Sequence, residues 1–189
     1  MTTTPEKIDL LIEARWIATV DTDTVLNYHA VAINNGRILA ILPTSEARQR
    51  YLPHKSEVLD EHILIPGLVN LHTHASMSLM RGMADDLPLT IWLQEHIWPA
   101  EARHASAQFV YDGTRLACVE MLKGGITCFN DMYFYPEAAA AAASETGMRA
   151  MLGITALEFP TPYASDADDY INKGLAVREV WLGNPLIGF

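Results

Sequence analysis

Cysteine is scarce in this sequence, and long apolar runs are missing from it. The two cysteines, Cys118 and Cys128, do not form a C-x-x-C pair, so we expect no disulfide framework and favour a reducing compartment, the cytoplasm. No run reaches the about 18 apolar residues that a membrane span needs. The N-terminal stretch lacks the basic segment and apolar core of a signal peptide. We therefore expect no membrane partner.

Positive charge is also in short supply. Lys and Arg total 13 against 23 Asp and Glu, which gives a formal net charge of −10 at pH 7, and the basic residues form no stripe. Nucleic acid and anionic membrane surfaces are therefore not expected as partners. With 189 residues, half of them hydrophobic, the chain is long enough to bury a substantial core.

Patterns typical of β-strands fill the first 65 residues. Strands are predicted over 8–20 and 57–65, with a short helical link near 45–53. Asn35-Gly36 separates two apolar runs, and both residue types tolerate the positive φ of a tight hairpin turn. We expect residues 1–65 to form a β-rich N-terminal part, and Pro66-Gly67 to end its last strand.

After Pro66 the pattern changes to strands that alternate with helices. A strand over 68–75 leads into a long connection with helical pieces, residues 75–105. Further helices are expected to begin at the capping residues Ser106 and Ser165 and at Pro136, with strands between and after them. This alternation predicts a parallel sheet with right-handed crossovers, whose ligand sites lie at the C-terminal ends of the strands.

Two histidines, His72 and His74, stand at that end of the first strand of the alternating part. Side chains in a strand alternate between faces, so both imidazoles share one face with Cα atoms roughly 6–7 Å apart. Two imidazoles that lean toward one point can bind a single ion, and neutral imidazole suits zinc, iron or nickel. Because a bare H-x-H motif also occurs by chance, the alternative of ordinary structural histidines stays open at this point.

Three longer segments make the chain recognisable. They read PGLVNLHTHASMSLMRGMADDLPLTIWLQEHIWPAE from Pro66, MLKGGITCFNDMYF from Met121 and GMRAMLGITALEFPTPYASDADDYINKGLAVRE from Gly147. Together they resemble the amidohydrolase superfamily, in the subgroup of 5-methylthioadenosine/S-adenosylhomocysteine deaminases and related chlorohydrolases. The resemblance covers nearly the whole chain.

The resemblance implies an α/β fold, a (β/α)8 TIM-like barrel flanked by a small β-sandwich, with residues 66–189 as the N-terminal part of the barrel. It implies a metal-dependent hydrolytic deaminase of adenine nucleosides that uses one divalent ion, for which Zn2+ is the leading candidate. The ion would be held by His72 and His74. Glu101 matches a family glutamate that contacts the substrate, here the ribose hydroxyls. The implied partner is thus a small adenine nucleoside, and relatives of this kind are often homo-oligomers.

Other side chains are weaker candidates. Trp92, Trp98 and Met83 are expected to line an apolar pocket, with core packing as the alternative. Asp131 is expected to support the site by hydrogen bonding, with a structural polar residue at a strand end as the alternative. A local loop network is expected for Arg81 with Asp85 and Asp86.

The chain is short for the fold that it resembles. Eight β/α units need about 250 residues for the barrel alone. The remaining metal ligands and catalytic residues are therefore expected beyond Phe189, and the 189 residues are expected to be inactive alone. Two alternatives remain: another aminohydrolase or chlorohydrolase acting on guanine-like or triazine rings, or a truncated, non-catalytic fragment. The sequence leaves the preferred adenine derivative open.

Overall fold

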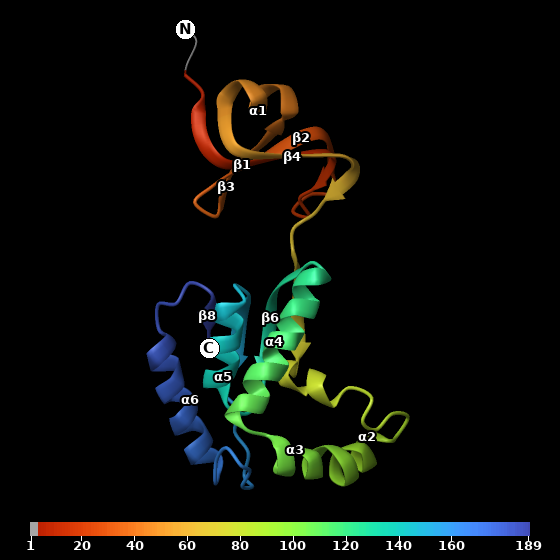
Figure 1. Cartoon of the computed structure of the whole chain (residues 1–189), viewed down its shortest axis with the longest axis vertical. Coiled ribbons are helices and arrows are strands. Elements are labelled where there is room, and N and C mark those ends of the chain that lie inside the picture. Colours follow the sequence, from red (N-terminus) through yellow and green to blue (C-terminus); the bar gives the residue numbers. More distant parts are fainter. Residues whose placement is uncertain (1–3) are drawn as a thin grey trace. The chain divides into compact units, whose positions relative to one another are not determined.

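The computed structural model describes residues 4–189 and shows a mixed α/β chain (Figure 1). The chain divides into two compact units, and the division falls between Pro66 and Gly67. Each unit has its own sheet and its own hydrophobic core. Within residues 4–189, no helix is both long enough and apolar enough to cross a bilayer.

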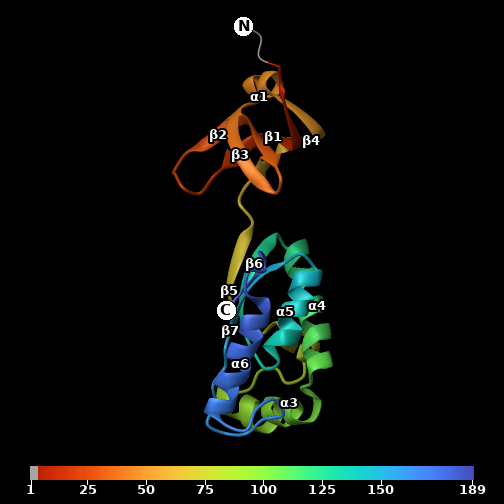
Figure 2. The ribbon, with the colours of Figure 1, turned by 90° about the vertical axis from the view of Figure 1, so that its left-hand side faces the viewer.

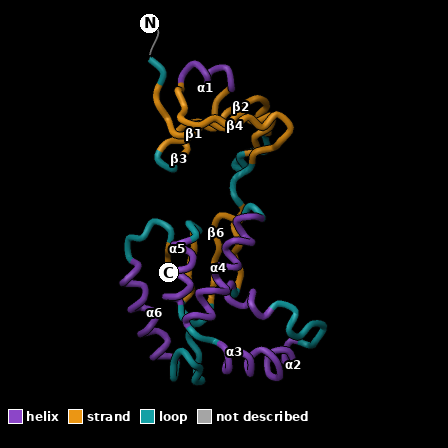
Figure 3. Tube along the Cα trace, viewed as in Figure 1, coloured by secondary structure: helices purple, strands orange, loops and turns teal. Residues whose placement is uncertain are grey.

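The first unit is built on a four-stranded sheet in the order β3-β2-β1-β4 (Figure 3). Strand β1 pairs antiparallel with β2 and parallel with β4, while β2 and β3 form a hairpin. The elements are β1 (Glu6–Ala18), β2 (Val25–Asn34), β3 (Arg37–Pro43), α1 (Thr44–Arg50) and β4 (Tyr51–Leu64).

The hairpin between β2 and β3 turns where the sequence predicts. Asn35 and Gly36 have φ values of 51° and 70°, the pair of positive angles that a two-residue turn requires. Helix α1 then returns the chain to the sheet, and its Ala47 is buried with Ile8 and Leu11 of β1. This cluster and a second one, of Ala14, Ile17 and Val31, form the core of the first unit.

The second unit contains a parallel sheet in the order β5-β6-β7-β8. Its strands are β5 (Leu68–Thr73), β6 (Ile126–Met132), β7 (Arg149–Gly153) and β8 (Ile187–Gly188). Strand order follows sequence order, and helices connect the strands. The predicted alternation of strands and helices is therefore confirmed for this unit.

The helices of the second unit begin and end near the expected residues. Helix α4 (Ala107–Lys123) is capped by Ser106, whose Oγ accepts from the amide of Phe109 at 3.2 Å, and α5 begins at Pro136. The start predicted for α6 was wrong by one residue. Asp166, not Ser165, is its N-cap and accepts from the amide of Asp169 at 2.9 Å, because both residue types can cap and the carboxylate has the shorter reach to that amide. The bounds of the last two helices are α5 (Pro136–Glu145) and α6 (Ala167–Trp181).

The connection after β5 contains four short helical pieces. They are a 3-10 helix η1 (Ala75–Met80), a turn of α-helix α2 (Leu89–Ile91), a π-helix η2 (Trp92–Ile97) and α3 (Trp98–His104). A π-helix widens the backbone by one residue per turn and is frequent at functional sites. Here it sets the directions of Trp92 and of the residues that follow it.

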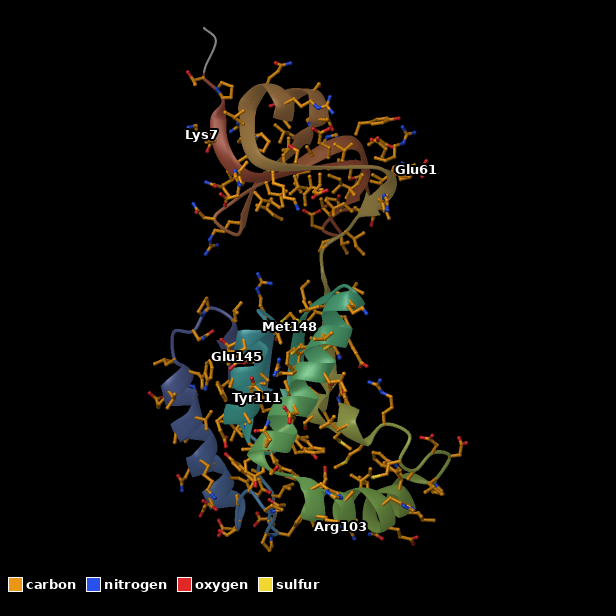
Figure 4. The ribbon with its side chains drawn as sticks, viewed as in Figure 1. Lys7, Glu61, Arg103, Tyr111, Glu145 and Met148 are labelled. Atoms are coloured by element: carbon orange, nitrogen blue, oxygen red, sulfur yellow. The ribbon has the colours of Figure 1, made fainter. Side chains whose placement is uncertain are left out.

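Helices cover one face of the second sheet. Figure 2 shows α4 and α5 along one side of its strands. On that side Phe129 and Leu152 are buried. On the opposite face, in the described part of the chain, Leu68, Met132 and Met151 stay 51%, 46% and 48% exposed. Figure 4 shows Tyr111 of α4 and Glu145 of α5, which are joined by a hydrogen bond from the phenol to the carboxylate.

Helix α4 touches the backbone of η1 at a single glycine. A Cβ built on Gly113 would lie 2.3 Å from the carbonyl oxygen of Ser76 and 2.8 Å from its Cα. These are backbone atoms, so no side chain can rotate away to make room. Ser76 is two residues beyond His74, and the close contact therefore fixes the chain that follows the histidines.

Gly113→Ala is expected to lower the free energy of unfolding by about 1–3 kcal/mol, the usual cost of overpacking. Urea denaturation of variant and parent measures the difference. Gly174→Ala is the matched control, because a Cβ there would meet the side chain of Ile154 at 2.3 Å rather than backbone. Adding Ile154→Ala should rescue Gly174→Ala. An unchanged midpoint for Gly113→Ala would contradict the backbone contact.

Candidate functional site

The two histidines of the H-x-H motif lie side by side at the C-terminal end of β5. His72 is in the strand, and His74 follows it as the residue that precedes η1. Their ring centroids are 5.3 Å apart, and the ring planes are inclined by 80°. The extended backbone thus brings both imidazoles to one region, as their spacing predicts.

A hydrogen bond fixes the orientation and the tautomer of His74. Its Nδ1 lies 2.7 Å from the carbonyl oxygen of Met132, at the end of the neighbouring strand β6. A carbonyl can only accept, so Nδ1 carries the proton and donates it. In the neutral tautomer that this bond favours, the lone pair is on Nε2, the arrangement in which imidazole binds a metal ion.

The donor set that the histidines offer is partial. Among residues 4–189, no group of three or more His, Cys, Asp and Glu side chains is arranged to hold a metal ion. Structural zinc sites take four protein ligands and catalytic ones take three. The two imidazoles are donors of the type that binds a metal ion, and the hydrogen bond to Met132 orients His74 as such ligands usually are. Together they supply part of the coordination of the ion.

Asp131 supports the backbone beside His74. Its side chain lies near the end of β6 and is 2% exposed, and Oδ1 accepts from the amide of Ala75 at 2.9 Å. Burial raises the pKa of this carboxyl to about 6, although the amides of Ala75 and Met132 and the nearby His74 partly offset the effect. Asp131, which was expected to support the site, therefore holds the first residue of η1, and within residues 4–189 its side chain forms no hydrogen bond with an imidazole.

The raised pKa of Asp131 makes stability depend on pH. The folded-state pKa of about 6 exceeds the ordinary aspartate value of 3.8, so folding favours the protonated carboxyl. Below pH 4 the carboxyl is largely protonated in the folded and unfolded states, so it adds no penalty. As pH rises from about 4 through 6, its ionisation lowers the free energy of unfolding. In metal-free protein, we expect Asp131→Asn to gain on the order of 2 kcal/mol relative to the parent between pH 4 and pH 7.

Urea denaturation with a chelator at several pH values measures this difference. Asp169→Asn is the control of opposite sign, because the hydrogen bond from Lys173 lowers the pKa of Asp169 and its contribution is lost as pH falls. A gap between Asp131→Asn and the parent that stays constant with pH would contradict the prediction.

Glu101 lies on α3 and is held by a tyrosine. The hydroxyl of Tyr133 donates to Oε1 of Glu101 at 2.8 Å. Burial raises the pKa of Glu101, and the hydrogen bond from Tyr133 and the charge of His74 act in the opposite direction. Burial and the carboxylate together raise the pKa of Tyr133, so the phenol keeps its proton and remains the donor. Within residues 4–189 only Oε1 of Glu101 is hydrogen-bonded, so its second oxygen can accept from a ligand.

His74 and Glu101 line the same cavity, with a volume of about 230 Å³. Its wall is mostly apolar. Trp92 and Trp98, both expected in such a pocket, lie in this wall, and the other lining side chains come from η1, the π-helix and the ends of β6 and β7. The site therefore combines an imidazole at one end, a carboxylate, and aromatic surface between strand ends and the connection.

Two residues of the connection lie elsewhere than expected. Met83 is 44% exposed and lines a neighbouring hollow, which shares Met77, Trp92 and Ile97 with the cavity. Arg81 does not join Asp85 and Asp86 in a loop network. The guanidinium of Arg81 forms two parallel hydrogen bonds, of 2.9 and 2.6 Å, with the carboxylate of Glu120 in α4.

Tyr133 and Leu157 were not among the expected site residues. Tyr133 follows β6 directly, and Leu157 lies beyond β7, so both stand just past the C-terminal end of a strand. That position was an available signal, because side chains there face the ligand end of a parallel sheet. The hydrogen bond between Tyr133 and Glu101 joins residues that are 32 positions apart, and no sequence pattern predicts it.

Comparisons with known proteins identify the family of this chain. The model of the amidohydrolase family matches residues 63–182. A 5-methylthioadenosine/S-adenosylhomocysteine deaminase of Saccharophagus degradans is 50% identical over 180 residues, which are 95% of this chain and 40% of that protein. A 5'-deoxyadenosine deaminase of Methanococcoides burtonii is 44% identical over 79% of this chain and 34% of its own length. The chain thus spans about 40% of the length of the first of these relatives.

Solved structures give the same result for the fold. An adenosine deaminase from Xanthomonas campestris with bound zinc superposes with a TM-score of 0.95 at 47% identity, over 98% of this chain and 42% of that one. A triazine hydrolase from Arthrobacter aurescens superposes with a TM-score of 0.80 over 95% of this chain and 45% of its own, and at 18% identity it shows a common fold alone. Because the family model covers well over half of the sequence, the chain belongs to the amidohydrolase family.

Proposed function

We propose that this chain supplies the first part of the active site of a metal-dependent hydrolytic deaminase that acts on adenine nucleosides. The observation that carries the proposal is the cavity in which His74, beside His72, and Glu101 meet an aromatic wall. The relatives described as adenine-nucleoside deaminases support it. The products would be ammonia and the corresponding inosine-type nucleoside.

His72 and His74 are the proposed metal ligands, and zinc is the proposed ion. Imidazole suits zinc, and the Xanthomonas campestris relative is described with bound zinc. When bound, such an ion supplies the acidity that turns water into a nucleophile near neutral pH. The chain itself directs Nε2 of His74 through the hydrogen bond from Nδ1 to Met132, and Asp131 holds the adjoining backbone.

Glu101 is the proposed acceptor for the ribose hydroxyls. One of its oxygens is bonded to Tyr133, and a carboxylate oxygen that accepts from a hydroxyl forms a strong, charge-assisted bond. Trp92 and Trp98 provide apolar surface for the purine ring and keep water from it. Met83 has no proposed part in the pocket.

A finer description of the fold belongs to the same proposal. We propose that the parallel sheet of residues 66–189 is the N-terminal part of a (β/α)8 barrel, and that residues 1–65 are part of a β-sandwich. The strand order β5-β6-β7-β8 and the helices on one face support the barrel. So do the exposed Leu68 and Met151 on the opposite face, which a closed barrel would bury.

The test uses the complete enzyme, by which we mean this chain joined to the part that the Saccharophagus degradans relative has beyond the match. The enzyme is loaded with zinc and given adenosine, 5-methylthioadenosine, guanine and a chlorotriazine. We expect ammonia release, and the ultraviolet change of adenine to hypoxanthine, with the two nucleosides only. Release of ammonia from guanine, or of chloride from the triazine, with no ammonia from the nucleosides, would contradict the proposal. The unmodified relative is the control for assembly and assay.

A further inference from the structure

Residues 81–105, the part of the connection that follows η1, are attached to helix α4 at both ends. At the far end Ser106, which comes soon after α3, is the N-cap of α4. At the near end the guanidinium of Arg81 donates to both carboxylate oxygens of Glu120, near the C-terminal end of α4, at 2.9 and 2.6 Å. One helix therefore holds the residue that opens this segment and the residue that follows it.

Arg81 stands in the turn that leads out of η1. Its φ and ψ are −58° and 131°, Gly82 has a φ of 73°, and the amide of Met83 donates to the carbonyl of Met80 at 3.2 Å. These are the features of a type II turn, in which the second central residue needs a positive φ and is therefore usually glycine. The turn sets the direction in which the chain leaves η1, and Arg81 is its first central residue.

The surroundings of this turn reach the cavity of the candidate site. Arg81 lines the hollow that also contains Met83, which has a volume of about 270 Å³. This hollow shares Met77, Trp92 and Ile97 with the cavity that contains Glu101. A displacement of the turn therefore changes a wall that the hollow and the cavity have in common.

The pair of Arg81 and Glu120 is suited to holding a direction. The two side chains are 64% and 43% exposed, and exposed ion pairs as a class contribute little to stability. Here two guanidinium nitrogens each contact one carboxylate oxygen, which fixes the orientation of the pair as well as its distance. The hydrogen bond from Arg81 also lowers the pKa of Glu120, so the carboxylate stays charged at neutral pH.

Helix α4 is a firm support for this pair. It is 17 residues long, and its Gly113 lies against the backbone of Ser76, so η1 is already held on the helix before Arg81 is reached. The pair therefore acts on the turn that follows η1 and on the segment beyond it. His72 and His74 precede η1, on the other side of this close contact.

We propose that Arg81 is a positioning residue, which acts through its ion pair with Glu120 to direct residues 83–105 so that Trp92 and Glu101 face the substrate. This inference rests on the proposed function and adds a residue to it. Because the histidines lie before the turn, the pair governs substrate binding and leaves the metal site unchanged. Loss of the pair should therefore raise KM, with little change in kcat or zinc content.

The experiment is a charge-reversal cycle in the complete enzyme, with adenosine as substrate. Arg81→Glu and Glu120→Arg each place two like charges together, and we expect each to raise KM about threefold to tenfold, the range that one well-formed ion pair can hold. The double variant restores opposite charges and should return KM to within about twofold of the parent, which only a direct interaction explains. A double variant no better than the worse single variant, or single variants with the KM of the parent, would overturn the inference.

Lys55→Glu is the matched control for reversing a charge in an exposed ion pair. Lys55 and Glu57 of β4 form such a pair at 2.7 Å in the first unit, with side chains that are 68% and 47% exposed. We expect Lys55→Glu to keep the KM of the parent. An equal rise in KM for Lys55→Glu and Arg81→Glu would assign the effect to overall charge and overturn the inference, as would loss of zinc from Arg81→Glu.

Failure of the inference differs from failure of the proposed function. If the complete parent enzyme leaves adenosine unreacted while the control relative is active, the proposed function fails and the inference falls with it. If the parent deaminates adenosine and the double variant shows no rescue, the function stands and the inference alone fails.

Discussion

His74→Ala is expected to remove the metal ion and the deaminase activity of the complete enzyme together. The substitution takes away one of two imidazoles whose rings are 5.3 Å apart, and the hydrogen bond to Met132 that orients it. Loss of an outer partner of a metal ligand costs about 10–100-fold, so loss of the ligand itself should exceed 100-fold in kcat/KM.

Two measurements on the same preparation check this expectation: zinc content after dialysis and steady-state deamination of 5-methylthioadenosine. His62→Ala is the control, because His62 is an exposed residue of β4 in the first unit. We expect it to keep both zinc and activity. A His74→Ala enzyme with a full zinc content and activity within twofold of the parent would refute the role of His74.

Glu101→Gln is expected to have the second large effect, on substrate binding. The amide keeps the size of the side chain and an oxygen for Tyr133, but it loses the charge that we propose faces the ribose. A hydrogen bond to a charged group contributes about 1.5–3 kcal/mol, so KM should rise about 10–100-fold, with a smaller change in kcat. Free adenine has no ribose, and its much slower deamination should be the same in both enzymes.

Tyr133→Phe separates the carboxylate from the group that holds it. Without the phenol, Glu101 loses a bond that lowers its pKa, so activity at acidic pH should begin to fall at a higher pH than in the parent.

The control for Glu101→Gln is Glu95→Gln, which removes the charge of an exposed carboxylate on the π-helix. Equal KM for nucleosides in Glu101→Gln and the parent would exclude Glu101 from ribose recognition.

Local chemistry explains which parts of the fold the sequence could predict. The Asn35-Gly36 turn and the cap at Ser106 depend on neighbouring residues, and both lie where expected. The rings of His72 and His74 meet because the alternation of a strand is a local rule. Asp166 replaced Ser165 as the cap because two adjacent residues could each perform it.

The rest depends on contacts between distant segments. Arg81 pairs with Glu120 rather than with Asp85 and Asp86, which are nearer in the sequence. Tyr133, just after β6, donates to Glu101 of α3. Neither choice follows from spacing along the chain. The π-helix Trp92–Ile97 is a further case, because the sequence predicts helical pieces there and gives no sign of the wider turn. The position of Met83 outside the cavity follows from that connection.

The connection between η1 and α3 has a consequence for how such enzymes diversify. The histidines stand on a strand, whereas Glu101 and both tryptophans of the cavity stand on the connection that follows it. The segment that would activate water and the segment that would recognise the substrate can therefore be altered one at a time. A graft of residues 81–105 between family members would exchange Glu101 and both tryptophans while His72 and His74 stay in place.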